Sequence, residues 1–381
     1  MRIYLFKRIL YIIPTLLFVI LLSFVLLHYS PGDPVERILA GQVTDNESLP
    51  TPSNIRLKDE IRTKLGLKLP LFYFSMSDMW ERKSLSNISP AEWEKYIPVI
   101  NFYSQNQFQR WLLGDGNNSK GIIRGDFGES WITHQNVSAI IRSRIGWSLF
   151  FTIIPVFLAY LISIPVGLKT AANPGSRFDN FTKILFNVFY SLPAFWVATL
   201  LMLTFCNPDM FNILPPSGVG PIGGFNDTDS FIHKIIHTIP YMVLPTICFT
   251  YSSFAFLSGS IKLSVTEVLR EDYIRTARAK GVDEKIIIKK HAFRNALLPM
   301  ITIFSHVFPY AIGGSVILET IFDIPGMGLA IYQSINSQDY PVIISIFMIT
   351  GLITMLGFLL TDILYAFADP RISYHSKKIK A

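Results

Sequence analysis

Few residues in this chain have the types and spacing that catalysis or metal binding needs. The seven histidines are scattered, except that His233 and His237 would share one face of a helix at i, i+4 spacing. Two imidazoles in this arrangement could hold a metal ion, but no third ligand is evident beside them. The two cysteines, Cys206 and Cys248, fall in apolar runs and make no disulfide framework. The sequence therefore predicts no catalytic residues and no metal site.

The motifs of nucleotide and peptide-bond chemistry are also missing. A phosphate-binding loop needs Gly-x-x-x-x-Gly-Lys followed by Ser or Thr, so that backbone amides and a lysine surround the phosphates. The chain contains no such run, and neither His-Glu-x-x-His nor Gly-x-Ser-x-Gly occurs in it. We therefore expect that the chain is not an enzyme and binds no cofactor itself.

One carboxylate, Asp362, lies inside a long apolar run. An ionisable residue within a membrane is a candidate for proton relay or ion coupling. A relay would need Asp362 to lie deep in the membrane beside a partner, whereas its position near the end of the run favours a paired carboxylate at the membrane edge. Because such residues are scarce here, ion-coupled transport is kept only as an alternative function.

The most strongly charged part of the chain is the segment 264–299, which stands between two apolar runs and is called the 264–299 loop. A Lys, Arg or Asp at the centre of a membrane helix costs about 2.5–3.5 kcal/mol on insertion scales. The loop must therefore lie in water, between two membrane spans.

Local signals predict two helices within this loop. Ser264 and Glu267 have the spacing of a capping box, which would begin the first helix. Gly281 can adopt the left-handed conformation that ends a helix, and Asp283 and Glu284 suit the start of a second one. A charged pair of helices joined by a glycine turn is well suited to pass force to a soluble partner.

The composition identifies the surrounding elements as membrane helices. Of the 381 residues, 50% are hydrophobic and only 16% are charged, against about 25% charged in soluble domains. Runs of about 20 apolar residues are long enough to cross a bilayer. We expect an all-α polytopic membrane protein with six spans, at Ile9–Tyr29, Trp147–Thr170, Ile184–Cys206, Tyr241–Ile261, Ala296–Leu318 and Val342–Phe367.

The basic residues predict the orientation of these spans. The net charge of +7 fits a lipid surface rather than nucleic acid, because the basic residues gather beside apolar runs and no basic–aromatic motif is present. Lys and Arg concentrate in short cytoplasmic loops. The 264–299 loop and both termini are basic, whereas the short loops 207–240 and 319–341 together contain a single Lys or Arg residue, Lys234. We therefore expect both termini and the 264–299 loop in the cytoplasm.

The chain divides into four expected parts. Residues 1–30 are expected to form a transmembrane helix, which is too long for a signal-peptide core and has no small-residue cleavage site after it. Residues 31–146 form an external domain that is rich in aromatic side chains. Residues 147–371 form a five-helix core that includes the 264–299 loop, and residues 372–381 form a cytoplasmic tail.

Short sequence motifs are spread over the whole chain, from the first apolar run to the residues after the last one. The most specific is the run Glu271-Asp272-Tyr273-Ile274-Arg275-Thr276-Ala277-Arg278-Ala279-Lys280-Gly281. The others are Pro14 in the first helix, Ser30-Pro31-Gly32-Asp33-Pro34, Leu65-Gly66-Leu67, Gly125-Asp126-Phe127-Gly128, Ser191-Leu192-Pro193-Ala194-Phe195-Trp196, His291-Ala292-Phe293-Arg294-Asn295-Ala296-Leu297-Leu298-Pro299, Glu319-Thr320-Ile321-Phe322 with Pro325-Gly326, Asp339-Tyr340-Pro341, and Asp369-Pro370-Arg371.

Together these motifs resemble the permease subunit of bacterial ABC importers for dipeptides and oligopeptides, the peptide/nickel family. This resemblance implies a six-helix permease of the type I ABC importer kind in the bacterial inner membrane. Its partners would be a second, homologous permease, two ATP-binding cassette ATPases that bind the ATP, and an external substrate-binding protein. The residues implied to couple the chain to an ATPase are Glu271, Asp272, Tyr273, Arg275, Thr276, Ala277, Arg278, Lys280 and Gly281. The residues that would line or gate the pore are Pro193, Phe195, Trp196, Gly313 and Gly314.

Two points stay open at this level. Residues 75–123 look like an insertion relative to shorter members of the family, and could either receive the binding protein or brace the external domain. The cargo implied is a dipeptide or oligopeptide, but similar permeases handle nickel chelates and glutathione. The alternatives from other classes are an ion-coupled secondary transporter and a membrane scaffold that uses the 264–299 loop only for docking.

Overall fold

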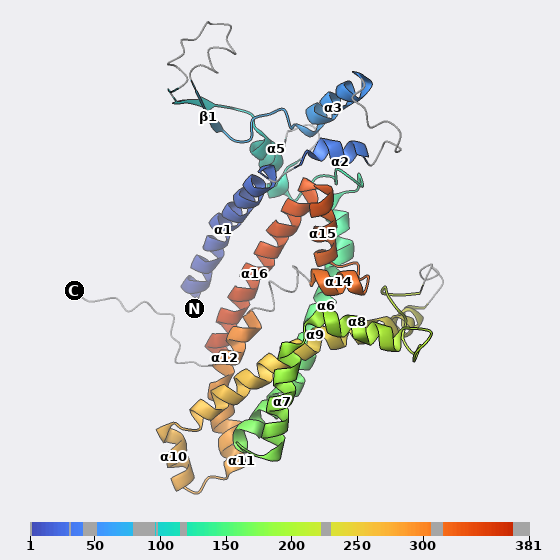
Figure 1. Cartoon of the computed structure of the whole chain (residues 1–381). Helices are drawn as coiled ribbons and strands as arrows, with labels where there is room; N and C mark the ends of the chain where they lie inside the picture. Colours follow the sequence, from blue (N-terminus) through green and yellow to red (C-terminus); the bar gives the residue numbers. More distant parts are fainter. Residues whose placement is uncertain are drawn as a thin grey trace, which may run out of the picture. The chain divides into compact units, whose positions relative to one another are not determined.

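The computed structural model describes residues 2–29, 32–40, 52–78, 96, 98–114, 120–221, 230–305 and 315–368, and most of them are helical (Figure 1). The chain forms two compact units. The first comprises residues 1–20, 141–333 and 346–381, and the second comprises residues 21–140 and 334–345. The expected domain boundaries at residues 30, 146 and 371 stay predictions.

Four helices of the described chain are long and apolar enough to cross a membrane. Their length and composition confirm the expected class, a helical polytopic membrane protein, because about 20 apolar residues span a bilayer. They correspond to the first, second, fourth and sixth expected spans. They are α1 (Arg2–His28), α6 (Val137–Ala172), α9 (Phe231–Val268) and α16 (Tyr340–Ala368).

The third expected span, Ile184–Cys206, is not one straight helix. It is divided between α7 (Arg177–Ser191) and α8 (Ala194–Phe205), which are bent by 95° at their junction. Pro193 causes the break, because it has no amide hydrogen and restricts Leu192 to an extended conformation. The Tyr251 hydroxyl donates a hydrogen bond to the freed Leu192 carbonyl at 2.9 Å. The bent pair therefore counts as a fifth span only if both helices are taken together.

The fifth expected span, Ala296–Leu318, is described only at its two ends. Its first part is α12 (Phe293–Ser305), and its last residues belong to α14 (Val316–Ile321). Residues 306–314, which include Gly313 and Gly314, lie outside the described residues. The total of six spans therefore stays a prediction.

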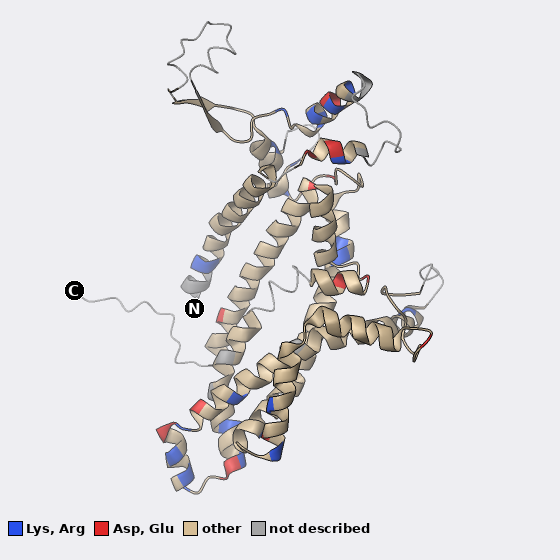
Figure 2. Cartoon of the chain, in the orientation of Figure 1, with Lys and Arg blue, Asp and Glu red and all other residues tan. Residues whose placement is uncertain are grey.

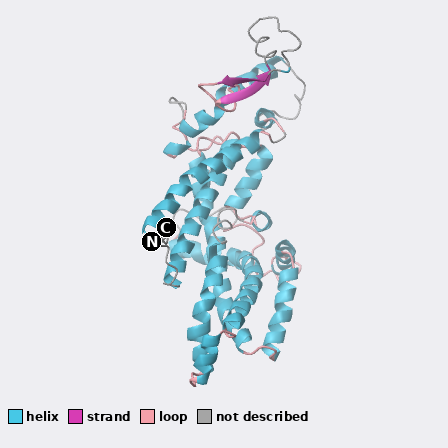
Figure 3. Cartoon of the chain, turned by 90° about the vertical axis from the view of Figure 1, so that its left-hand side faces the viewer, coloured by secondary structure: helices cyan, strands magenta, loops and turns pink. Residues whose placement is uncertain are grey.

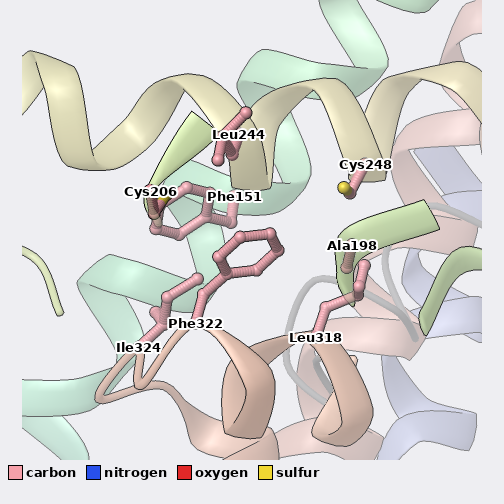
Figure 4. Close-up of a cluster of buried hydrophobic side chains, with 8 residues drawn as sticks. All are labelled: Phe151, Ala198, Cys206, Leu244, Cys248, Leu318, Phe322 and Ile324. Atoms are coloured by element: carbon pink, nitrogen blue, oxygen red, sulfur yellow. The ribbon is translucent and has the colours of Figure 1, made fainter. Parts of the chain in front are cut away.

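A cluster of buried apolar side chains holds α6, α8, α9 and α14 together in the first unit (Figure 4). Phe151 of α6 has 1% of its surface exposed, and Cys248 of α9 is fully buried. Close packing of this kind favours a rigid junction, since van der Waals packing is a main force that holds helices together within a bilayer. The members are Phe151, Ala198, Cys206, Leu244, Cys248, Leu318, Phe322 and Ile324.

Helices α6 and α9 also cross closely nearer to the 264–299 loop. Gly167 of α6 lies so near α9 that a Cβ atom there would be only 2.6 Å from the Ile261 Cγ2 atom. The Ser163 hydroxyl donates to the Phe254 carbonyl oxygen at 3.1 Å across the same crossing. Small residues allow such an approach between membrane helices. The crossing continues into a second buried cluster, made of Ala171, Ile261, Val265, Ala292, Ala296 and Met300, which adds α12.

The second unit contains short elements and the only strands of the described residues. They are α2 (Pro34–Ala40), α3 (Pro52–Leu65), β1 (Phe74–Asp78), β2 (Pro98–Phe102), α5 (Gln107–Leu113) and η2 (Ile122–Arg124). The strands form an antiparallel pair in the register Phe74↔Phe102 to Asp78↔Pro98 (Figure 3). This small sheet departs from the all-α expectation. Apart from Phe74 it lies in the expected insertion 75–123, of which residues 79–95, 97 and 115–119 lie outside the described residues.

Aromatic side chains make up much of the core of the second unit. Phe24 packs edge-on against Phe72 and Phe108, with ring centroids 5.5 and 5.4 Å apart. Asp339 adds a polar anchor, because its buried carboxylate accepts hydrogen bonds from the Trp131 amide at 3.0 Å and from the Ser130 hydroxyl. These contacts give Asp339, the first residue of the Asp339-Tyr340-Pro341 motif, a structural role.

Candidate functional site

The candidate site is the charged part of the 264–299 loop, and its first helix does not begin where the capping-box pattern predicts. Ser264 and Glu267 lie inside the last turns of α9, which continues to Val268. The helix continues because Ile261 and Val265 are fully buried in the cluster with α12. Burial of these side chains outweighs the local capping signal, so the capping-box prediction is wrong.

The first separate helix of the loop is α10 (Asp272–Ala279). Glu271 precedes it in an extended conformation, and its carbonyl oxygen accepts from the amides of Ile274 at 3.0 Å and Arg275 at 3.3 Å. Asp272 places negative charge in the first turn, where it interacts favourably with the helix dipole. Of the side chains on α10, Ile274 is fully buried whereas that of Tyr273 is 43% exposed. Ile274 therefore fixes α10 to the rest of the chain.

The end of α10 confirms the prediction for Gly281. This residue has φ = +77°, in the left-handed region. The Val282 amide donates to the Ala277 carbonyl at 3.2 Å, and the Gly281 amide donates to the Arg278 carbonyl at 2.9 Å. These two hydrogen bonds form a Schellman motif, which satisfies the carbonyl groups left open at a helix end. The turn is therefore fully hydrogen-bonded rather than slack.

The second helical run begins where Asp283 and Glu284 predict it. The Asp283 carboxylate accepts from the Lys285 amide at 2.7 Å and so caps α11 (Glu284–Ile286). The chain then continues without a break through the π-helical segment η3 (Ile287–Ala292) into α12. Ile287 is fully buried, and η3 contacts α10. Because α10 contacts η3 and η3 continues into α12, a displacement of α10 would also move α12.

An ion pair connects the two sides of the glycine turn. The Arg278 guanidinium donates from Nε to Oε2 of Glu284 at 3.0 Å and from Nη2 to Oε1 at 2.6 Å. The hydrogen bond from Arg278 lowers the pKa of the Glu284 carboxyl below its ordinary value, and the same bond raises the pKa of Arg278. Both groups are therefore charged at neutral pH. A weaker pair, Arg275 with Asp272 at 3.3 Å, lies along α10 itself.

The structure brings all the predicted coupling residues together on α10 and its two ends. Ala277 is half-buried, and the other eight are exposed: Glu271, Asp272, Tyr273, Arg275, Thr276, Arg278, Lys280 and Gly281. Figure 2 shows the same concentration of charge at α10 and α11, in contrast to the apolar long helices. Ile274, in contrast, is buried within the chain and is not available to a partner.

The predicted pore residues are only partly placed. Pro193 makes the break between α7 and α8, and Phe195 and Trp196 lie in the first turn of α8 with 49% and 47% of their surfaces exposed. Gly313 and Gly314 lie outside the described residues. A role for these five residues in the pore stays a prediction.

The structure adds two polar pairs that sequence reasoning missed. The buried Asp179 carboxylate, at the start of α7, accepts from the Lys262 ammonium of α9 and from the Gly175 amide at 3.0 Å. The buried Glu319 carboxylate accepts from the Ser148 hydroxyl at 3.1 Å and from the Leu329 amide at 2.7 Å. The Leu329 amide belongs to the first turn of α15 (Met327–Ser337), so Glu319 caps this helix.

The other candidates for chemistry have ordinary surroundings. Asp362 forms an ion pair with Arg8 of α1, at 3.2 Å from its Nε atom, which agrees with the prediction of a paired carboxylate. The rings of His233 and His237 are adjacent, with centroids 4.2 Å apart. No group of three or more His, Cys, Asp or Glu residues that could hold a metal ion occurs in the described part of the chain.

Comparison with known proteins gives one consistent family. Residues 163–374 match the family model described as "Binding-protein-dependent transport system inner membrane component". The oligopeptide transport system permease protein AppB of Bacillus subtilis (strain 168) is 32% identical over 98% of this chain and 100% of its own length.

Two further relatives show the range of names within the family. The inner membrane ABC transporter permease protein YejB of Escherichia coli O157:H7 is 31% identical over 98% of this chain and 99% of its own length. The glutathione transport system permease protein GsiC of Salmonella paratyphi A (strain ATCC 9150 / SARB42) is 31% identical over 97% of this chain and 99% of its own length. A chain of the MetNI methionine ABC transporter has a TM-score of 0.45 at 16% identity, covering 61% of this chain and 97% of that one, too weak a likeness for an argument.

Proposed function

Because the chain belongs to the binding-protein-dependent transport system inner membrane components, as a permease subunit of an ABC importer, we propose that it forms half of a pore for dipeptides or oligopeptides. A second, homologous permease would form the other half. Two ATP-binding cassette ATPases would bind and hydrolyse the ATP, and an external binding protein would deliver the cargo. This chain itself would carry out no chemistry on either molecule.

One observation carries the mechanical part of this proposal, namely the construction of α10. Its buried side, Ile274, fixes it to the chain, while eight of the nine predicted coupling residues remain exposed to a partner. The Schellman turn at Gly281 and the ion pair between Arg278 and Glu284 hold it against the run that leads to α12. An ATPase that closes on ATP would push α10, and the helical run that packs against it and leads to α12 would move with it.

The family membership also supports a location in the inner membrane with several spans. We place both termini and the 264–299 loop on the cytoplasmic side, because their Lys and Arg content matches short cytoplasmic loops. This orientation puts α10 on the side where ATP is available. The segment 31–146 would then lie outside, with the insertion 75–123 near the binding protein.

Peptides are the cargo that we favour. Relatives named for oligopeptide and dipeptide transport match nearly the whole chain. GsiC, named for glutathione, keeps a related cargo in view, since glutathione is itself a peptide-like molecule. The two named cargo types can be separated by offering both to one preparation.

The test is purification of the tagged chain from its native membrane under gentle conditions, followed by reconstitution in lipid vesicles. The proposal predicts that a second permease and ATPase subunits copurify, and that the complex takes up a labelled peptide only when ATP and the binding protein are present. Uptake that is driven by an ion gradient without ATP would contradict it and support a secondary transporter. Assembly without any uptake, in conditions under which a known peptide importer is active, would support a scaffold.

A further inference from the structure

Side-chain hydrogen bonds, in addition to those of the backbone, connect α10 to α11. Arg278 belongs to the last turn of α10, and Glu284 is the first residue of α11. Two parallel hydrogen bonds, of 3.0 and 2.6 Å, connect the guanidinium to both carboxylate oxygens. An Arg fork of this kind fixes the direction of the bond as well as its length, which a lysine cannot do.

Glu284 stands at the start of a long helical run. From Glu284 the chain is helical through α11, η3 and α12 as far as Ser305. On the other side of the turn, α10 packs against this run, and Ile274 and Ile287 are both fully buried. The Arg278–Glu284 pair thus joins the end of α10 directly to the first turn of the run that contains α12.

We propose that Glu284 is a positioning residue for coupling: by holding the Arg278 guanidinium, it fixes the angle between α10 and the helical run 284–305. The proposal rests on the function assigned above, in which α10 contacts a partner ATPase. Glu284 itself need not touch the ATPase. Because Glu284 holds Arg278, a displacement of α10 moves α12 as well, instead of only bending the chain at the glycine turn.

The exposure of the Arg278–Glu284 pair indicates that Glu284 controls the angle of α10 rather than the stability of the fold. The side chains of Arg278 and Glu284 are 43% and 51% exposed, and ion pairs with this exposure contribute little to folding. The backbone hydrogen bonds around Gly281 keep the turn formed even without them. Loss of the ion pair should therefore loosen the angle of α10 while leaving the chain folded and assembled.

The experiment measures peptide uptake per ATP hydrolysed in the reconstituted complex with all its subunits. Glu284→Gln removes the charge with little change in shape, and Lys285→Gln is the matched control at the next, exposed position. We expect Glu284→Gln to lower uptake per ATP by about twofold to fivefold, the size of effect that loss of a half-exposed ion pair allows, without loss of ATPase subunits. Lys285→Gln should keep the wild-type ratio.

A double-mutant cycle shows whether Glu284 acts through Arg278. In an Arg278→Gln background, Glu284→Gln should cause no further fall in uptake per ATP, whatever Arg278→Gln costs by itself. Amide hydrogen exchange gives a second readout, and Glu284→Gln should speed exchange in residues 272–286, whereas Lys285→Gln should not. These measurements separate a positioning role from a general loss of stability, which would speed exchange throughout the first unit.

Two results would overturn the inference. One is a Glu284→Gln complex with the wild-type uptake per ATP. The other is an equal fall in both backgrounds, which would mean that Glu284 acts without Arg278. Failure of the proposed function has a different signature, because the wild-type complex would then show no uptake that depends on ATP.

Discussion

Substitution of Gly281 isolates the contribution of one backbone angle to coupling. Gly281 has φ = +77°, and a Cβ atom built there meets no other atom within 4 Å. The Cβ atom of a substitute therefore causes no collision, and the left-handed backbone conformation is what opposes it. That conformation costs an L-residue about 1–2 kcal/mol, which corresponds to a factor of roughly 5–30 in the equilibrium for the ordered turn.

Because the cost depends on the residue type, a series of variants makes the prediction specific. Asn tolerates the left-handed region better than Ala, and a β-branched residue tolerates it worst. We therefore expect uptake per ATP to fall in the order Gly281, Gly281→Asn, Gly281→Ala and Gly281→Val. Gly146→Val is the control, because Gly146 lies in α6, has open space around it and does not have a positive φ.

The assay is ATP-driven uptake of a labelled peptide by the reconstituted complex, measured together with ATP hydrolysis. Gly281→Val should keep its ATPase subunits and hydrolyse ATP while it moves little peptide. Uptake per ATP equal to wild type in Gly281→Val would refute the reasoning. So would a Gly281→Asn variant as poor as Gly281→Val, because the order of the series comes from φ alone.

Contacts within the first unit and the loop give three more predictions. Gly167→Val should place a side chain against Ile261 at the α6–α9 crossing, where a Cβ atom would lie 2.6 Å from the Ile261 Cγ2 atom. Because this overpacking costs about 1–3 kcal/mol, the melting temperature of the purified chain should fall. Gly146→Val should leave the melting temperature nearly unchanged. Tyr251→Phe leaves the Leu192 carbonyl at the α7–α8 bend without its donor; it should lower the stability by about 1–3 kcal/mol, and an unchanged denaturation curve would contradict the role given to this hydrogen bond. Acid should loosen α10, because the folded-state pKa of Glu284 lies below its ordinary value; the ion pair is therefore formed above that value and lost as the pH falls through the lowered one. Amide protection in residues 272–286, corrected for the intrinsic pH dependence of exchange, should fall in that pH range in the wild type, and an equal fall in Glu284→Gln would rule this explanation out.

Local signals in the sequence predicted the parts of the site that depend only on nearby residues. Gly281 ends α10 and Asp283 caps α11, as their types indicate, because each acts on amides and carbonyls a few residues away. The capping box at Ser264 and Glu267 failed for the opposite reason. The burial of Val265 in the cluster with α12 continues α9 through it, and no local pattern contains that information.

Contacts between distant residues could not be read from the sequence. Ser148 and Glu319 are 171 positions apart, and Asp179 and Lys262 are 83 apart, so no spacing rule connects them. Proline disrupts a helix wherever it stands inside one, but the bend of 95° at Pro193 also depends on how α7 and α8 pack on α9, where Tyr251 binds the Leu192 carbonyl. The apolar runs identified the class of fold because their length alone matches a bilayer.

The central claim, that α10 is the point where a partner ATPase acts on this chain, is tested most directly by crosslinking. A photo-reactive amino acid replaces Tyr273, whose side chain is 43% exposed on α10, in the complete complex in native membranes. The same residue placed at Tyr96, which is 87% exposed in the segment expected outside the membrane, is the control. We predict a covalent adduct between position 273 and an ATP-binding subunit, and none from position 96. An adduct with the ATPase from position 96, or none from position 273 in a complex that retains its ATPases, would contradict the account.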